Sequence, residues 1–202
     1  MYTLIGYPRT RAMRVLWMLE ELGEPYDYIP AAPHAAEVNA LNPTGKVPVF
    51  KDGDTALTDS VAICQYLADK HGQLTYPAGT LERARQDGVT QFTVDVLEGA
   101  LWTAAKNSFI HPEELRVPEV KRVCAAEFAD GLRHLEHLLG EGPFVMGAEF
   151  TVPDILIAHC ANWAKLAKFD LPESGPVADY LERVWSRPAL AAAMKRGAEA
   201  IA

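Results

Sequence analysis

The sequence predicts a small α/β domain followed by an all-helical domain. Its first part places a strand-type run, a helical pattern and a second strand-type run in order over residues 2–29. Residues 47–58 then hold two short runs around a polar break, which is typical of a β-hairpin. Beyond residue 80 the apolar residues recur at helical spacing, and no segment reads as a convincing strand. Strands mixed with helices indicate a layered sheet domain, and the remainder indicates a helical bundle.

The elements of the first part follow one another closely. After the strand "YTLIGY", the segment "TRAMRVLWMLEELG" has apolar residues at helical spacing and stops at Gly23, a residue type that commonly ends helices. The second strand, "PYDYIP", completes a unit that we expect to be parallel. A weak helical pattern covers residues 34–41. After the hairpin, an amphipathic helix over residues 59–72 closes at Gly72.

The second part begins after a link that contains proline and glycine, residues 73–79. We place the α/β domain at residues 1–74, a linker at 75–79 and the helical domain at 80–202. The first two long helices are expected over 81–108 and 117–139. The remaining helices are one that begins with a capping box of Thr151 and Asp154, one over 175–185, and one over 189–200 that follows Pro188.

The composition is that of an ordinary globular chain, and it excludes several kinds of partner. Of the 202 residues, 49% are hydrophobic and 23% are charged, which is enough for a sizeable core. The net charge of -8 argues against nucleic acid or an anionic membrane, because both need a basic surface. No apolar run could span a bilayer, and residues 1–15 do not read as a signal peptide, so we expect a cytoplasmic protein.

The cysteines and histidines do not predict a metal site. Cys64, Cys124 and Cys160 are far apart, each within an apolar helical pattern, and we interpret them as buried, reduced thiols. His134 and His137 are three residues apart on a predicted helix, but no further ligand accompanies them. We therefore expect no metal cofactor.

The segment "NPTGKVPVF" puts Pro48 inside what otherwise reads as a strand. Proline lacks the backbone N–H that a sheet needs, so it is tolerated at an edge, a bulge or the first residue of a strand. Either an edge turn or a cis bond would suit it. In both cases Val47 is extended and can keep a free N–H and C=O for an extended, peptide-like ligand.

Asp59 and Ser60 stand at the start of the helix that follows the hairpin. Unsatisfied N–H groups and the positive end of the helix dipole favour an anion such as a carboxylate there, while Asp59 could receive an ammonium group. The alternative is a plain helix cap. Together with an exposed backbone at Val47, this helix start would suit a short peptide that carries an α-amino acid head.

Four segments in register carry a resemblance to a known family. They are "RAMRVLWMLEELGEPYDY", "LNPTGKVPVF", "LTDSVAICQYLADKHG" and "GAEFTVPDILIAHC". Their order and spacing resemble the cytosolic glutathione transferase superfamily, as a bacterial-type member. The resemblance implies a thioredoxin-like N-terminal domain with a mixed four-stranded sheet, a cis-proline at Pro48, an all-helical C-terminal domain and a homodimer.

The resemblance also implies a binding site for glutathione, which serves as a co-substrate. The cysteinyl backbone of glutathione would pair with Val47, next to Pro48. Its γ-glutamyl carboxylate would meet Ser60 and its amino group Asp59. Lys46, in the same loop as Val47, would support the glycyl carboxylate.

Attack by glutathione requires the thiolate, so the protein must lower the pKa of the thiol. In this superfamily a hydroxyl or thiol donor lies just after the first strand or at the start of the first helix. We rank Thr10 first as this donor and Tyr7 second. Thr10 could instead cap the helix, and Tyr7 could be an aromatic residue that packs between the domains. Arg11 could add positive potential near the sulfur or be a solvated surface residue.

The second substrate is predicted to be a small hydrophobic electrophile. Trp102, Ala105 and Phe109 fall on one side of the first long helix and could line its pocket, although an ordinary core between helices is the alternative. Trp163 and Trp185 we interpret as core. The leading function is a glutathione transferase of the detoxification type. A glutathione-dependent isomerase or peroxidase, or a glutathione-binding scaffold with little catalysis, are the alternatives.

Overall fold

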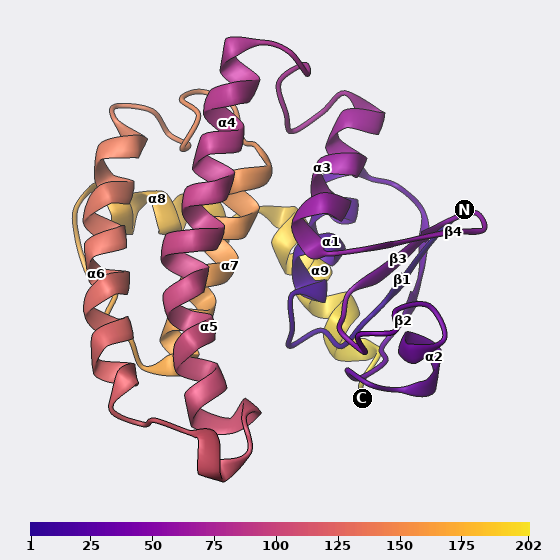
Figure 1. Ribbon diagram of the computed structural model, residues 1–202. Coiled ribbons are helices and arrows are strands. Elements are labelled where there is room, and N and C mark those ends of the chain that lie inside the picture. Colours follow the sequence, from indigo (N-terminus) through magenta and orange to yellow (C-terminus); the bar gives the residue numbers. More distant parts are fainter. The chain divides into compact units, whose positions relative to one another are not determined.

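The computed structural model describes residues 1–202, and the chain forms two compact units. One unit contains residues 1–77 together with 186–202, and the other contains residues 78–185. The first unit holds the only sheet, while the second is helical (Figure 1). The predicted order of an α/β part and a helical part is therefore confirmed. The units group residues by spatial contact, so the domain boundaries at 74 and 80 stay a prediction.

The sheet has four strands in the order β2-β1-β3-β4. Its strands are β1 (Tyr2–Ile5), β2 (Tyr26–Ile29), β3 (Val49–Asp52) and β4 (Thr55–Thr58). β1 runs parallel to β2 and antiparallel to β3, and β3 forms the predicted hairpin with β4. The mixed four-stranded sheet is thus confirmed.

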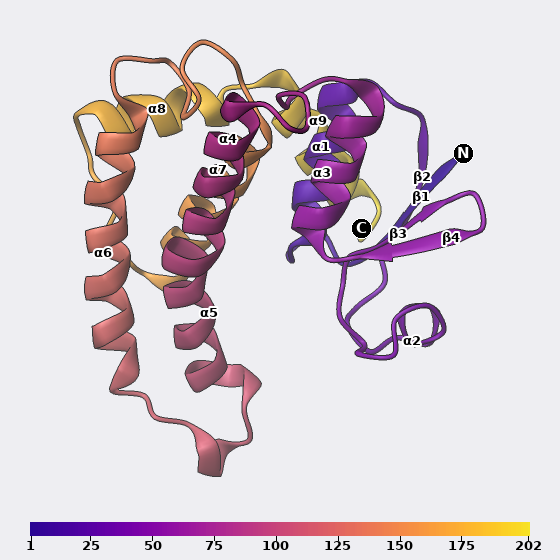
Figure 2. The ribbon, with the colours of Figure 1, turned by 45° about the horizontal axis from the view of Figure 1, so that its top comes forward.

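Helices cover both faces of this sheet (Figure 2). α1 (Ala12–Leu22) and α3 (Ser60–His71) pack side by side on one face, and each ends at a glycine in the left-handed conformation, as predicted. The short helix α2 (Ala36–Asn39) lies on the other face, where its buried residue Val38 packs with Ile5 and Val49. The apolar side chains on both faces form the core that fixes the strand ends.

The last helix, α9 (Pro188–Glu199), packs against α1 within the first unit. Arg187 makes a bidentate ion pair with Glu21 of α1, with N–O distances of 2.6 and 2.7 Å. Arg196 donates to the Tyr26 carbonyl oxygen at 2.7 Å, and its guanidinium lies 4.1 Å from the centre of the Tyr26 ring. The end of the chain is therefore held on the α/β unit by contacts that span more than a hundred and sixty residues of sequence.

α9 also approaches the loop after β1. A Cβ atom placed on Gly197 would lie 2.8 Å from Cβ of Pro8, which is closer than two carbon atoms can pack. The approach therefore requires glycine at position 197. Through Pro8 the last helix supports the segment that joins β1 to α1.

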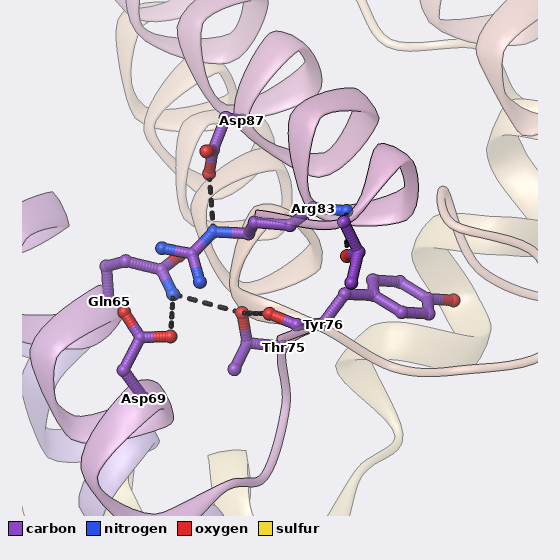
Figure 3. Close-up of polar contacts among 7 residues, drawn as sticks. Gln65, Asp69, Thr75, Tyr76, Arg83 and Asp87 are labelled. Carbon is purple, nitrogen blue, oxygen red and sulfur yellow. Dashed lines mark hydrogen bonds and ion pairs between the residues drawn. The ribbon is translucent and has the colours of Figure 1, made fainter. Parts of the chain in front are cut away.

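The link between α3 and the helical unit is fastened by polar side chains (Figure 3). The Gln65 amide donates to Asp69 at 3.1 Å and to the Thr75 hydroxyl at 3.0 Å. These bonds attach the link to α3. Within the helical unit, Thr80 accepts from the Arg83 N–H and so caps the next helix.

The helical unit is built from α4 (Leu81–Phe92), α5 (Gly99–Ala105), α6 (Val120–Leu139), α7 (Val152–Ala167) and α8 (Pro176–Trp185). α4 and α5 follow one another along one long helical rod, and α6 and α7 run alongside it in both ribbon views (Figures 1 and 2). None of the helices in the structure combines the length and apolar character that crossing a membrane requires.

The first long helix differs from the prediction of one regular helix over residues 81–108. Two π-helical segments, η1 (Thr93–Glu98) and η2 (Lys106–Ile110), interrupt it, and a short 3-10 turn, η3 (Glu113–Leu115), follows. Spacing of apolar residues cannot distinguish a π-helical turn from an α-helical one, since the inserted residue shifts the pattern only locally.

Trp163 of α7 and Trp185 of α8, which we interpreted as core residues, are half-buried.

The carboxylate of Asp154 organises the start of α7. It accepts hydrogen bonds from the Thr151 N–H and hydroxyl, which confirms the predicted capping box. It also accepts from the Val145 N–H at 3.0 Å and from the Tyr180 hydroxyl of α8 at 2.9 Å. Burial raises the pKa of Asp154, and these hydrogen bonds oppose that shift. One buried side chain thus joins α7, α8 and the preceding loop.

Replacing Asp154 should destabilise the protein strongly. Asp154→Ala leaves four donor groups buried without an acceptor, so we expect the free energy of unfolding to fall by about 3 kcal/mol or more. Tyr180→Phe is the matched control, because it removes one of the four bonds and should cost about 1 kcal/mol. Urea denaturation measures both values. Equal losses in the two variants would contradict the central role of the carboxylate.

Gly197→Ala and Gly88→Ala should change the stability of the protein in opposite directions. Gly197→Ala forces α9 away from Pro8, and we expect a loss of about 1 kcal/mol or more in unfolding free energy. Gly88→Ala, on α4, meets no atom within 4 Å, so it should stabilise the protein by about 0.5–1 kcal/mol. Thermal unfolding of the two variants compares them directly, and stabilisation by both would disprove the tight contact.

Candidate functional site

Three segments of the α/β unit meet at Gly6, the residue after β1. A Cβ atom on Gly6 would lie 2.8 Å from Cβ of Ala12, 3.3 Å from Cβ of Val47 and 3.5 Å from Cα of Pro48. The first of these distances leaves no room for a side chain at position 6. The end of β1, the start of α1 and the turn before β3 are therefore in contact, and they bring the predicted residues of the first helix and of the proline loop together.

The turn before β3 has the geometry expected from its proline. The Val47–Pro48 bond is cis, as predicted, and β3 begins directly after it at Val49. The proline thus precedes the strand and occupies no position in the hydrogen-bond ladder. Its missing N–H therefore leaves no gap in the sheet. Val47 is half-buried, and none of the backbone hydrogen bonds of this turn uses its N–H or C=O. Lys46 beside it is exposed.

Asn42 shapes this turn and was not singled out in the sequence. Its amide nitrogen donates to the Lys46 carbonyl oxygen at 2.9 Å, and its amide oxygen accepts from the Thr44 N–H and hydroxyl. The side chain is buried. The Asn-Pro pair at positions 42 and 43 is a turn signal that could have indicated this role. Asn42 thereby fixes the backbone immediately before Val47.

The start of α3 lies beside the same turn. In the antiparallel ladder Val49 pairs with Thr58, so Asp59 and Ser60 follow β4 where Pro48 and Val47 precede β3. Asp59 is exposed and has φ 72°, a conformation that residues other than glycine seldom adopt. Its Oδ1 atom accepts from the N–H groups of the second and third helical residues, Val61 and Ala62. The cap that we considered as the alternative role of Asp59 is therefore present.

Ser60 is buried and contacts a charged residue of α1. Nη1 of Arg14 lies 3.2 Å from the Ser60 hydroxyl oxygen, and both side chains are nearly inaccessible to solvent. Sequence reasoning missed Arg14, because α1 is buried over most of its surface and a single charge within it has no periodic signal. The pair links the start of α1 to the start of α3.

Thr10 and Tyr7, the two candidates for donating a hydrogen bond to the glutathione sulfur, differ in the hydrogen bonds that they make within the chain. The Thr10 hydroxyl donates to the Tyr7 carbonyl oxygen at 2.6 Å and accepts from the Ala12 N–H at 3.1 Å, so it shapes the start of α1. Tyr7 is half-buried, and the bonds of this loop use its carbonyl oxygen rather than its hydroxyl. Arg11, at the same helix start, is partly exposed.

Two further side chains define the surroundings of this loop. The Tyr28 hydroxyl of β2 donates to the Gly6 carbonyl oxygen at 2.8 Å, and burial, with a smaller effect of nearby Tyr7, raises the pKa of Tyr28 to about 12. Within α3, Cys64 is fully buried and burial raises its pKa to about 12, so this thiol is not available as a nucleophile. No three His, Cys, Asp or Glu side chains are grouped so that they could hold a metal ion.

The residues predicted to line the electrophile pocket lie in the helical unit. Trp102 is half-buried and its ring stacks edge-on with Trp163, with centroids 6.3 Å apart. Ala105 is buried, whereas Phe109, in the π-helical segment η2, is 65% exposed. Ala105 thus lies in the core of this unit and Phe109 on its surface. A pocket formed by the three residues stays a prediction.

Comparison with known proteins identifies the family. The model of the glutathione S-transferase N-terminal domain matches residues 4–75, and that of the glutathione S-transferase C-terminal domain matches residues 82–196. The chain is 32% identical to glutathione S-transferase GstB of Escherichia coli K12 over 161 residues, which cover 74% of this chain and 76% of the relative. The chain therefore belongs to the glutathione S-transferase family.

Solved structures agree with this assignment. The glutathione transferase URE2P6 from Phanerochaete chrysosporium, in complex with oxidized glutathione, superposes with a TM-score of 0.83 at 27% identity, over 98% of this chain and 97% of that one. A glutathione transferase from Methylococcus capsulatus gives a TM-score of 0.81 at 26% identity, over 98% of this chain and 100% of that one. The thioredoxin-like fold of the first unit and the helical C-terminal region are those of this family.

Proposed function

We propose that this protein is a glutathione transferase that activates the thiol of glutathione for attack on a small hydrophobic electrophile. The observation that carries the proposal is the meeting of three segments around Gly6, beside the start of α3. The three segments contribute a Val47 backbone without hydrogen bonds in its turn and two hydroxyl groups at Tyr7 and Thr10, and α3 contributes a helix N-terminus at Ser60. This set matches the parts of a tripeptide with a thiol in its centre.

Each part of glutathione has a proposed partner in the α/β unit. The Val47 backbone would pair with the cysteinyl residue, as in the addition of a strand. Ser60 would bind the γ-glutamyl carboxylate and Asp59 the amino group. Lys46 would bind the glycyl carboxylate, for which its exposed ammonium group is suited. The binding of oxidized glutathione by URE2P6 from Phanerochaete chrysosporium supports glutathione as the ligand of this family's fold.

The proposed reaction forms a carbon–sulfur bond. A hydroxyl group of the protein donates a hydrogen bond to the sulfur, which favours the thiolate and releases the thiol proton to water. The sulfur then attacks the electrophilic carbon, and a leaving group such as halide departs with its electron pair. Positive charge at Arg11 would favour the thiolate further.

The hydrogen bonds make Tyr7 the better placed of the two donors. A hydroxyl group has one proton, and that of Thr10 is directed at the Tyr7 carbonyl oxygen at 2.6 Å. The hydrogen bonds of this loop involve the Tyr7 carbonyl oxygen and leave its hydroxyl proton unused. We therefore propose Tyr7 as the donor and Thr10 as the residue that shapes the loop, which reverses the order preferred from the sequence.

Other parts of the proposal rest on the family resemblance. They are an electrophile pocket that includes Trp102, Ala105 and Phe109, a homodimer, a cytoplasmic location, and a helical domain over residues 80–202. A glutathione-dependent isomerase or peroxidase would use the same glutathione site, and the choice of second substrate distinguishes them from a transferase.

Replacing the hydroxyl groups of Tyr7 and Thr10 one at a time shows which of them donates to the sulfur and which only shapes the loop. We expect Tyr7→Phe to slow conjugation of a chromogenic aryl halide by roughly 10- to 100-fold at neutral pH and to raise the apparent pKa of the rate, because the thiolate loses its hydrogen bond. Glutathione affinity, measured by calorimetry, should change little. Thr10→Ala should alter rate and affinity together without moving that pKa.

The same measurements test the whole function. A shift of the rate pKa in Thr10→Ala alone would restore Thr10 as the donor. Glutathione binding without conjugation of any of a broad panel of electrophiles would favour a binding protein. Failure of the wild type to bind glutathione would refute the proposed site.

The charge of Asp59 can be tested without removing its cap. Asp59→Ala also removes the acceptor for two N–H groups and should cost about 1 kcal/mol of stability. Asp59→Asn keeps a side-chain oxygen for the cap and tolerates the positive φ, but it loses the charge that would bind the ammonium group. We expect glutathione affinity to fall about tenfold in Asp59→Asn. Asp54→Asn, an exposed change of equal charge in the hairpin turn, is the control, and equal affinities in both would refute the role of Asp59.

A further inference from the structure

A buried positive charge lies directly behind the proposed site. The Arg14 side chain of α1 is 1% exposed, and its Nη1 atom lies 3.2 Å from the hydroxyl oxygen of Ser60, which is 2% exposed. Burying a guanidinium group is costly in free energy, and packing alone would be served as well by an apolar side chain of similar size. The position of Arg14 therefore calls for a reason connected with its charge or its hydrogen bonds.

The chemistry of the two groups fixes the direction of their hydrogen bond. A guanidinium group has donors only, so the Ser60 oxygen must accept from Arg14. The hydroxyl has one proton, and with its oxygen facing Arg14 as an acceptor this proton can point to another acceptor. Arg14 thus holds the Ser60 hydroxyl as a donor.

The backbone around Ser60 offers a second donor. Asp59 accepts from the N–H groups of Val61 and Ala62 through Oδ1, and from Ile63 through its carbonyl oxygen. Among the first four N–H groups of α3, that of Ser60 is left without an acceptor in these contacts. Its N–H and O–H groups therefore form a pair of donors at a helix N-terminus, backed by a positive charge.

We propose that Arg14 is a positioning residue for the carboxylate of the ligand: it orients the Ser60 hydroxyl so that Ser60 donates to the γ-glutamyl carboxylate of glutathione. The inference rests on the proposed function and adds to it a residue that acts through Ser60 without touching the ligand. The Arg14 charge also reaches the groups behind the helix start, since it lowers the pKa of Cys64 against the larger effect of burial.

Removing the α-carboxylate from the ligand provides the test. We would measure by calorimetry how the full chain binds glutathione and γ-aminobutyryl-cysteinyl-glycine, which is glutathione without that carboxylate. Arg14→Met has a similar volume and no donor. We expect it to weaken glutathione binding about tenfold and binding of the analogue by no more than about twofold. Arg14→Lys keeps a charged donor and should recover part of the loss.

A control variant accounts for general loosening of α1. Trp17→Phe removes the hydrogen bond from Trp17 to Glu21 on the same helix without altering the Arg14 and Ser60 pair. It should change the affinities for the two ligands by equal factors. Equal factors for the two ligands in Arg14→Met as well would show a merely structural role for Arg14 and overturn the inference.

Combined substitutions show whether Arg14 acts through Ser60. In a Ser60→Ala background, Arg14→Lys or Arg14→Met should weaken glutathione no further than about twofold, because the hydroxyl to be oriented is gone. A full additional loss would mean that the charge attracts the carboxylate directly, which also overturns the inference. If Arg14→Met does not fold, Arg14→Lys alone decides by the same comparison. A wild type that binds neither ligand refutes the proposed function itself, an outcome distinct from these.

Discussion

The close approach of three backbone segments at Gly6 is the constraint on which the rest of the α/β unit depends. The end of β1, the start of α1 and the turn before β3 all pack against Gly6, which has no side chain to keep them apart. The turn before β3 can come this close because Pro48 lies outside the sheet and the strand begins only at Val49. A strand that began two residues earlier would pair the backbone of Val47 and leave none of its polar groups for a ligand.

The far end of the chain supports the same region. Gly197 of α9 lies against Pro8, directly after Tyr7, and the ion pair of Arg187 with Glu21 holds the helix on α1. The loop that carries both hydroxyl candidates thus contacts the last helix through Pro8. In a molecule of two compact units, the unit with the proposed site includes residues from both ends of the sequence.

Local signals explain which parts could be predicted from the sequence. The strands, the glycine ends of α1 and α3 and the capping box of α7 each depend on a few neighbouring residues, and all are present. The cis bond at Pro48 is also present, but the local sequence left an edge turn open and the family resemblance predicted the cis form. Two of the missed features join distant residues. The pair of Arg14 with Ser60 spans 46 positions, and the attachment of Arg187 to Glu21 spans 166. Neither alters a local pattern, so periodicity cannot indicate them. The ligand roles of the site residues remain predictions, because no contact within the chain tests them.

The capping and binding roles of the site residues are compatible, because they use different atoms. Asp59 gives Oδ1 to two N–H groups of α3, and its second carboxylate oxygen and negative charge remain for an ammonium group. Its positive φ costs about 1–3 kcal/mol, which those two capping bonds help to offset. Ser60 likewise accepts from Arg14 with its oxygen while its proton stays available. A helix start that must be capped in any case therefore holds the groups of the proposed site in place before a ligand arrives, which reduces the entropy that binding must overcome.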